Sequence, residues 1–219
     1  MTVVYLGVSF FSCIIGTICG IGGGVIVKPI LDMFAFSSIT TINFLSTCMV
    51  FVMSCFSVIK SFFSGKNIIK LRYVTPLAIG AAIGGFLGSN IFVYIKQLFE
   101  NPNTVGAVQS ACLMLISSGV LIYTVYKGKI KTYNMTGIIP CIGIGLTLGL
   151  VSSFLGIGGG PINLVVLCFF FGMDSKMAAI NSLYIILISK VTNILATIFT
   201  NNVPEFNCSH FTIHPKKET

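Results

Sequence analysis

The chain has 219 residues, of which 55% are hydrophobic and 8% are charged, and its formal net charge is +8. An average soluble domain carries about 25% charged residues, so a water-soluble fold could not cover its surface with these side chains. High hydrophobicity also excludes a disordered chain. The composition predicts an integral membrane protein in a lipid bilayer, with its cations in loops rather than on a surface that binds nucleic acid.

Apolar segments long enough to cross a bilayer recur along the chain. A span needs about 20 apolar residues. The last stretch of the chain is too polar to span. We expect membrane segments, in chain order, at 2–36, 42–63, 73–95, 105–126, 135–172 and 177–199.

The segments 2–36 and 135–172 are too long for single straight helices. A helix of about 35 residues would reach about 50 Å, against a hydrocarbon core of about 30 Å. Each of the two segments contains a run of glycines near its middle, at Gly20–Gly24 and Gly156–Gly160. We therefore expect each segment to form two helical pieces separated by a break.

The glycine run is part of an internal repeat, because the same five residues, GIGGG, occur in both places. Ser46 and Ser182 follow the two runs at the same spacing, each within a small polar cluster. The expected fold is all-α: a polytopic helical membrane protein with two internal repeats and glycine-broken helices. The expected division is a first repeat at 1–126, a basic loop at 127–134, a second, incomplete repeat at 135–203 and a polar tail at 204–219.

Broken backbone at membrane depth is tolerated only where it is buried in protein or lines a wet cavity. The half-helix that follows a break directs its positive end at that place, where it favours an anion. Paired breaks in two halves are typical of a transporter site. The alternative is that glycine only lets helices cross closely. The candidate substrate-binding residues are Gly20, Gly22, Gly23, Gly24, Asn43, Ser46, Thr47, Gly156, Gly158, Gly159, Gly160, Asn181 and Ser182.

Two lysines within the membrane segments are candidates for attracting an anion. Lys28 is four residues before Asp32, so the two could pair on one helical face. Lys190 lies near the middle of 177–199, where a cation is costly unless it faces a cavity, an anion or a polar neighbour. Snorkelling or a shifted helix boundary is the alternative for Lys190. No catalytic dyad and no set of metal ligands is evident, so we expect no enzyme, no cofactor and no metal site.

The loops 64–72 and 127–134 are rich in lysine and arginine, and basic loops face the cytoplasm. Both loops are therefore expected to be cytoplasmic in a multi-pass protein of the cell membrane. The side of the N-terminus stays open, because it depends on whether the second arm of 2–36 crosses the membrane or returns.

The sequence resembles the sulfite exporter TauE/SafE family of permeases over residues 1–203. The resemblance is carried by GxGGG followed by a proline in each half, at Pro29 and Pro161, and by Pro76 before the glycine ladder Gly80, Gly84 and Gly88. It implies a duplicated transporter of a small, sulfur-containing anion such as sulfite or an organosulfonate, working by alternating access around the two breaks.

The second half is shorter than the first, since no apolar segment follows 177–199. A homo-oligomer or a partner chain that supplies the missing last helix is therefore expected as an alternative to a chain that works alone. Two other functions remain open on the sequence: a channel-like anion pore, and a non-transporting or partner-dependent membrane subunit.

Overall fold

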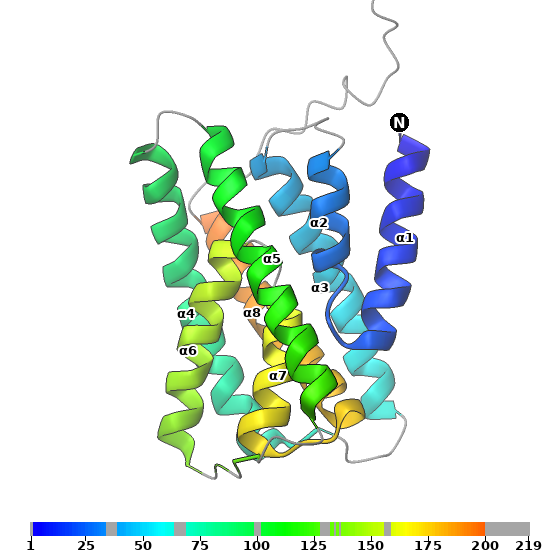
Figure 1. Ribbon diagram of the computed structural model, residues 1–219, viewed down its shortest axis with the longest axis vertical. Coiled ribbons are helices and arrows are strands. Elements are labelled where there is room, and N and C mark those ends of the chain that lie inside the picture. Colours follow the sequence, from blue (N-terminus) through cyan, green and yellow to red (C-terminus); the bar gives the residue numbers. More distant parts are fainter. Residues whose placement is uncertain are drawn as a thin grey trace, which may run out of the picture.

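The computed structural model describes residues 2–33, 39–63, 69–98, 102–127, 132–133, 135, 137–155 and 159–199. The regular elements in this part are all α-helices, so the expected all-α fold is confirmed (Figure 1). The helices are α1 (Thr2–Cys19), α2 (Gly24–Met33), α3 (Ile39–Phe63), α4 (Leu71–Leu98), α5 (Pro102–Tyr126), α6 (Ile138–Leu155), α7 (Gly160–Phe171) and α8 (Ser175–Phe199).

Several sequence predictions fall outside the described residues. These are Gly156 and Gly158, the polar tail 204–219, and most of the two basic loops. Lys28 and Asn43 lie within helices, but their side chains are outside the described part.

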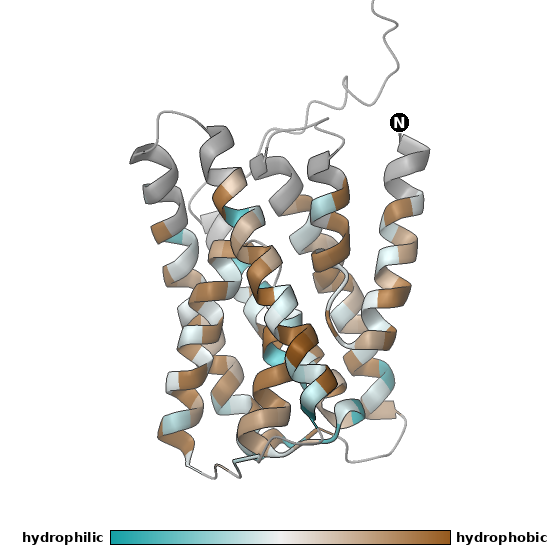
Figure 2. Ribbon diagram, viewed as in Figure 1, coloured by the Kyte–Doolittle hydropathy of each residue, from teal (hydrophilic) through white to brown (hydrophobic). Residues whose placement is uncertain are grey.

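Five of the helices contain a stretch that is long and apolar enough to cross a membrane, and two shorter helices are also apolar. Hydrophobic residues occur along the described helices over most of the height of the bundle (Figure 2). Leu115 and Met114 on α5 are each 74% exposed, and Phe11 on α1 is 65% exposed. Such a surface is unfavourable in water but suits lipid tails. The long candidate spans are Phe44–Phe63, Leu71–Ile91, Ala107–Tyr126, Ile138–Leu155 and Ser175–Leu195.

The closest helix pair is α4 with α6, and glycines on both helices make it possible. A Cβ on Gly80 or Gly84 would overlap a carbonyl oxygen of α6, and a Cβ on Gly145 or Gly149 would overlap one of α4. Small residues let helix backbones approach in membranes, where dispersion forces and weak hydrogen bonds drive association. Buried apolar side chains continue this contact into the main core, among them Leu77, Leu148, Leu167 and Ile185.

The helices α1 and α2 form a hairpin, and α6 and α7 form another that enters the bundle from the opposite end (Figure 1). Gly20 and Gly22 connect α1 to α2 with φ values of 67° and 77°, and Gly159 precedes α7 with a φ of 71°. Only glycine adopts such values without strain. Since α2 returns toward the end where α1 begins, the second helix of the segment 2–36 does not cross to the opposite end of the bundle.

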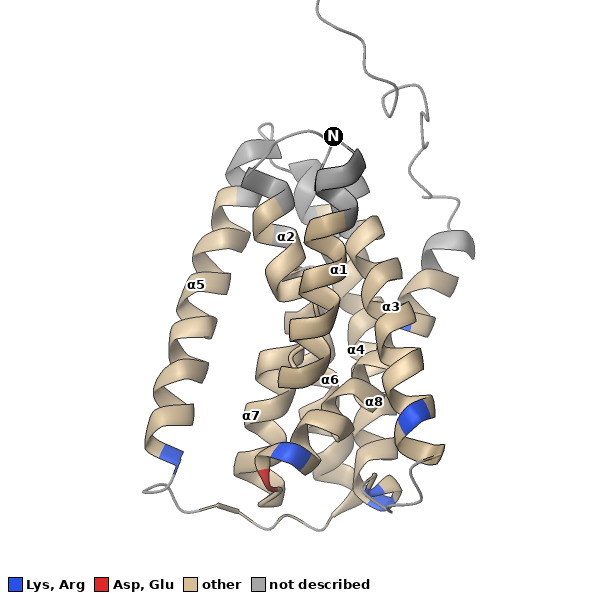
Figure 3. Cartoon of the chain, turned by 90° about the vertical axis from the view of Figure 1, so that its right-hand side faces the viewer, with Lys and Arg blue, Asp and Glu red and all other residues tan. Residues whose placement is uncertain are grey.

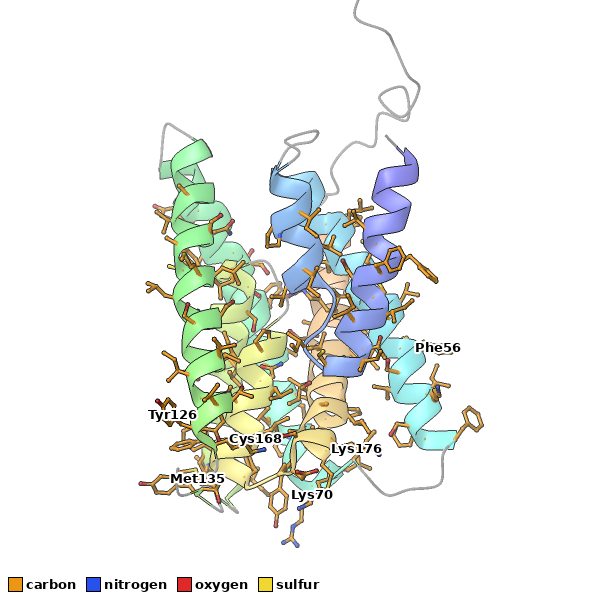
Figure 4. The ribbon with its side chains drawn as sticks, turned by 45° about the vertical axis from the view of Figure 1, so that its right-hand side comes forward. Phe56, Lys70, Tyr126, Met135, Cys168 and Lys176 are labelled. Carbon is orange, nitrogen blue, oxygen red and sulfur yellow. The ribbon has the colours of Figure 1, made fainter. Side chains whose placement is uncertain are left out.

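The described basic side chains gather mainly at the end of the bundle opposite to the N-terminus (Figure 3). Lys70 and Lys176 lie at this end together with Tyr126 and Met135 (Figure 4). The ammonium of Lys127 donates to Ser175 Oγ at 2.9 Å, which ties the end of α5 to the start of α8. The described residues of the two basic loops, 69–72, 127, 132 and 133, therefore lie at the same end of the molecule.

The glycine contact between α4 and α6 predicts that Gly145→Ala lowers thermal stability. The new methyl group meets the Leu77 carbonyl of α4, whereas no atom lies within 4 Å of the Cβ position of Gly143 on the same helix. Gly143→Ala is the matched control, because both variants gain the same helix propensity of about 1 kcal/mol. Overpacking should outweigh this gain by about 1–2 kcal/mol. Thermal unfolding in detergent measures the effect, and equal midpoints for both variants would contradict it.

Candidate functional site

The first glycine-rich turn contacts the start of α7, at the end of the second glycine run, inside the bundle. Gly160, the first residue of α7, lies against the backbone of Ile21 in the α1–α2 turn, and a Cβ at this position would overlap the Ile21 carbonyl oxygen. In the same turn, Gly20 lies against Ala179 of α8, and a Cβ on Gly20 would overlap the Ala179 side chain. The turn of the first half therefore packs directly on two helices of the second half.

The remaining described glycines of the first run are also buried. Gly22 lies between Val50 of α3 and Ile186 of α8, whose methyl groups are 3.8 and 3.4 Å from its Cβ position. The Cβ position of Gly23 is 3.0 Å from the Ser12 carbonyl oxygen of α1. Close packing, the alternative interpretation of these glycines, accounts for the contacts of Gly20, Gly23 and Gly160.

The first turn of α2 directs few amide groups outward. The N–H groups of Val25 and Ile26 donate to the carbonyls of Gly22 and Gly23, and that of Val27 also donates to Gly23. The amides of this turn are thus already engaged within the chain. An anion near the N-terminus of α2 would be stabilised by the helix dipole rather than by these N–H groups.

Ser182 connects α8 to the α1–α2 turn. Its side chain is fully buried, and its hydroxyl lies 2.5 Å from the Gly20 carbonyl and 2.8 Å from the Ala179 carbonyl of its own helix. A serine hydroxyl has one proton to donate, so the two carbonyls share it. Ser46 on α3 is buried to the same degree, with 1% of its surface exposed.

Asn181, next to Ser182, holds the start of α4. Its Oδ1 accepts the backbone N–H of Lys70 at 3.0 Å, and its Nδ2 donates to the Met177 carbonyl at 2.6 Å. Lys70 immediately precedes α4, where backbone N–H groups have no partner inside the helix. Asn181 therefore satisfies one of these groups, and both ends of its amide are occupied by backbone.

Lys190 and Thr47, two of the residues singled out from the sequence, lie together. Lys190 is 4% exposed, and its ammonium donates to Thr47 Oγ1 at 3.4 Å, across the contact between α8 and α3. A buried cation in a membrane helix is costly unless polar groups surround it. The structure therefore places a positive charge inside the protein, between the two halves.

Polar side chains near the second turn were missed by the sequence analysis. Ser152 and Asn163 are both buried, and the oxygen of each side chain lies close to the Cβ position of Gly159. Asn163 Oδ1 has no hydrogen-bond partner in the described part of the chain. The signal for Asn163 was its position as a lone amide in the apolar α7. Such a buried acceptor usually marks a functional or hydrated place.

Gln109 was also missed, because α5 lies outside both glycine-containing segments. It is 3% exposed, and its Nε2 donates to the Phe154 carbonyl at 2.6 Å. Phe154 belongs to the last turn of α6, directly before the second glycine run. Gln109 therefore holds α5 against the end of α6. Among the described residues, no group of three or more histidine, cysteine or acidic side chains could hold a metal ion.

The family model for the sulfite exporter TauE/SafE matches residues 5–207, nearly the whole chain. The chain belongs to the TauE/SafE family. A relative in Bacillus subtilis (strain 168), described as the probable membrane transporter protein YunE, is 26% identical over 208 residues, which cover 86% of this chain and 75% of the relative. No solved structure matches the chain. The TauE/SafE chain is thus a multi-pass membrane transporter and not an enzyme.

For this TauE/SafE chain, the bond from Ser182 to Gly20 predicts that Ser182→Ala destabilises the fold. The Gly20 carbonyl would lose its buried donor, at a cost of about 1 kcal/mol. Ser118→Ala on α5 is the matched control, because Ser118 is exposed and bonds only the Met114 carbonyl of its own helix. Thermal unfolding in detergent should show a lower midpoint for Ser182→Ala alone. Equal midpoints would mean that the contact between the halves does not depend on this hydroxyl.

Proposed function

We propose that the protein is a secondary transporter of a small anion, a sulfur-containing one such as sulfite or an organosulfonate. It works by alternating access around the two glycine-rich turns. The observation that carries the proposal is the contact of Gly160 with the Ile21 carbonyl, where hairpins from opposite ends of the bundle meet. Transporter sites of this kind lie where two broken helices face each other.

The two halves are inverted repeats in this proposal. The hairpin α1–α2 with α3 corresponds to the hairpin α6–α7 with α8. Val50 and Ile186 support the correspondence, because they follow the two glycine runs at the same spacing and both contact Gly22. Two structurally related halves can rock against each other and expose the same central site to either side of the membrane.

The attraction for an anion has two sources. The helices α2 and α7 both begin at the glycine-rich turns, so the positive ends of their dipoles point to the place where the turns meet. The buried ammonium of Lys190, held by Thr47, adds a full positive charge between the halves. Neutral hydroxyls and amides then bind the oxygens of the anion without repelling it.

The proposed substrate site includes the residues expected from the sequence and adds Ser152 and Asn163, whose side-chain oxygens lie beside Gly159. Asn181 contributes through position rather than direct contact, because its amide caps the start of α4. The expected residues are Gly20, Gly22, Gly23, Gly24, Asn43, Ser46, Thr47, Gly156, Gly158, Gly159, Gly160 and Ser182, with Lys28 and Lys190 as anion-attracting cations.

In the proposed orientation the protein lies in the cell membrane, and the basic end of the bundle faces the cytoplasm. The described lysine and arginine residues are concentrated there (Figure 3). Positive loops are retained on the cytoplasmic side during membrane insertion. The start of α1 then lies toward the outer side, because it is at the opposite end of the bundle.

Flux of labelled sulfite into proteoliposomes tests the proposed alternating access around the glycine-rich turns. Gly23→Leu and Gly159→Leu should abolish flux, because Gly23 lies against the Ser12 carbonyl and Gly159 has a positive φ and lies against Ser152. Gly119→Leu on α5 is the control, since no atom lies within 4 Å of its Cβ position. Unchanged flux in both site variants, with all three proteins folded, would refute alternating access around these turns.

Substitution of Lys190 tests whether the positive charge of its ammonium attracts the anion. Lys190→Met should lower sulfite flux by about tenfold or more, which corresponds to about 1.4 kcal/mol of lost binding. Lys190→Arg should keep much of the flux, because it keeps the charge. Lys176→Met is the matched control, an exposed lysine at the start of the same helix. Equal losses for Lys190→Met and Lys190→Arg would show that packing, and not charge, is what matters at this position.

A further inference from the structure

A cavity of about 310 Å³ lies between α2, α5 and α6, on one side of the glycine-rich turns. It is large enough for a small solute with several waters, since one water occupies about 30 Å³ in the liquid. The lining combines polar and apolar groups, and three polar residues come from α5. Its lining includes Val25, Pro29, Gln109, Ser110, Ser117 and Leu155.

The cavity wall contains the residues that flank both glycine runs. Val25 directly follows Gly24, the last glycine of the first run, and Leu155 directly precedes Gly156, the first glycine of the second. Gln109 extends this connection, because its amide donates to the carbonyl of Phe154 in the last turn of α6. A solute in the cavity would therefore lie beside the start of α2 and the end of α6.

Pro29 adds a polar group to the wall from the backbone. It lies inside α2 and has no N–H, so the carbonyl of Val25, four residues earlier, lacks the amide donor that a regular α-helix would provide. Both residues line the cavity. The Val25 carbonyl can thus accept a hydrogen bond from water or solute.

The α5 helix has two different faces around this cavity. Ser110 and Ser117 are seven residues apart, on one side of the helix, and both line the cavity. Ser118, Leu115 and Leu121 are exposed on the outside of the bundle. Leu113 and Met114 line the cavity between these two serines, and the two hydroxyls supply polar groups that suit a water-filled space.

We propose that this cavity is an aqueous vestibule through which a small, hydrated oxoanion reaches the glycine-rich turns. The hydroxyls of Ser110 and Ser117 donate to the oxygens of the anion or of its water shell, and the Val25 carbonyl accepts from that water. This inference rests on the proposed transport function. It assigns the path to α5, the last helix of the first repeat, which has no counterpart in the second, incomplete repeat.

Single cysteines at adjacent positions of α5 test the vestibule. Ser117→Cys points into the cavity and Ser118→Cys out of the bundle, so the two variants form a matched pair. A water-soluble, negatively charged methanethiosulfonate reagent, present on both sides of proteoliposomes, reacts only with thiols that water reaches. Labels added beyond those of the wild-type chain are counted by intact mass. Ser117→Cys should react about tenfold faster than Ser118→Cys, because thiolates form in water and not in lipid.

Methanesulfonate, an organosulfonate that reacts with neither the reagent nor the mixed disulfide, should at saturating concentration slow the labelling of Ser117→Cys. Labelling should also inhibit methanesulfonate flux in this variant only. Equal labelling rates for the two variants would overturn the vestibule, even if the wild-type protein transports sulfite. Selective labelling of Ser117→Cys in a protein that shows no sulfite flux would instead support a wet path and reject sulfite as the transported anion. The two failures are therefore distinguishable.

Discussion

Backbone hydrogen bonding inside a bilayer is the constraint on which this structure depends. Lipid offers no donors or acceptors, so each backbone group at membrane depth must find its partner within the protein. Regular helices meet this requirement by themselves. The α1–α2 turn meets it differently: its carbonyls accept from the first turn of α2, and Ser182 of α8 donates to Gly20. Irregular backbone is thus possible here because a second half of the protein covers it.

Glycine makes that coverage geometrically possible. Backbone can lie directly on backbone only where no side chain intervenes, as at Gly160 on Ile21 and at the crossing of α4 with α6. The two contacts differ in consequence. The α4–α6 contact joins long, continuous helices in the main core, whereas Gly160 joins two turns in the middle of the bundle. The first is suited to rigidity, and the second is where the proposed mechanism requires the two sides to separate and close.

Much of this arrangement could be predicted from the sequence, because the signals are local. Continuous apolar runs indicate α3, α4, α5 and α8, and a run of glycines favours positive φ values, which Gly20 and Gly22 have. Lys190 was recognisable as a cation in an apolar helix. Its neighbour Thr47 was singled out separately, as a member of the small polar cluster around Ser46.

The partners of these residues could not be predicted, since they depend on how distant segments pack. Asn181 caps α4 through Lys70, and Gln109 holds the end of α6, although neither contact has a sequence pattern. No local signal shows that Gly160 faces Ile21 rather than lipid or another helix. Single polar residues in apolar helices, such as Asn163, are visible in the sequence, but their meaning depends on which side of the helix is buried.

The position of α5 has a topological consequence. Three helices, α3, α4 and α5, lie between the two hairpins, and each runs the length of the bundle (Figure 1). An odd number of crossings reverses the direction in which the chain arrives, so α6–α7 enters from the end opposite to α1–α2. With one crossing more or fewer, both hairpins would enter from the same end and their tips could not approach head to head. The antiparallel meeting of the two turns is therefore a matter of parity, and α5 is the helix that makes the count odd.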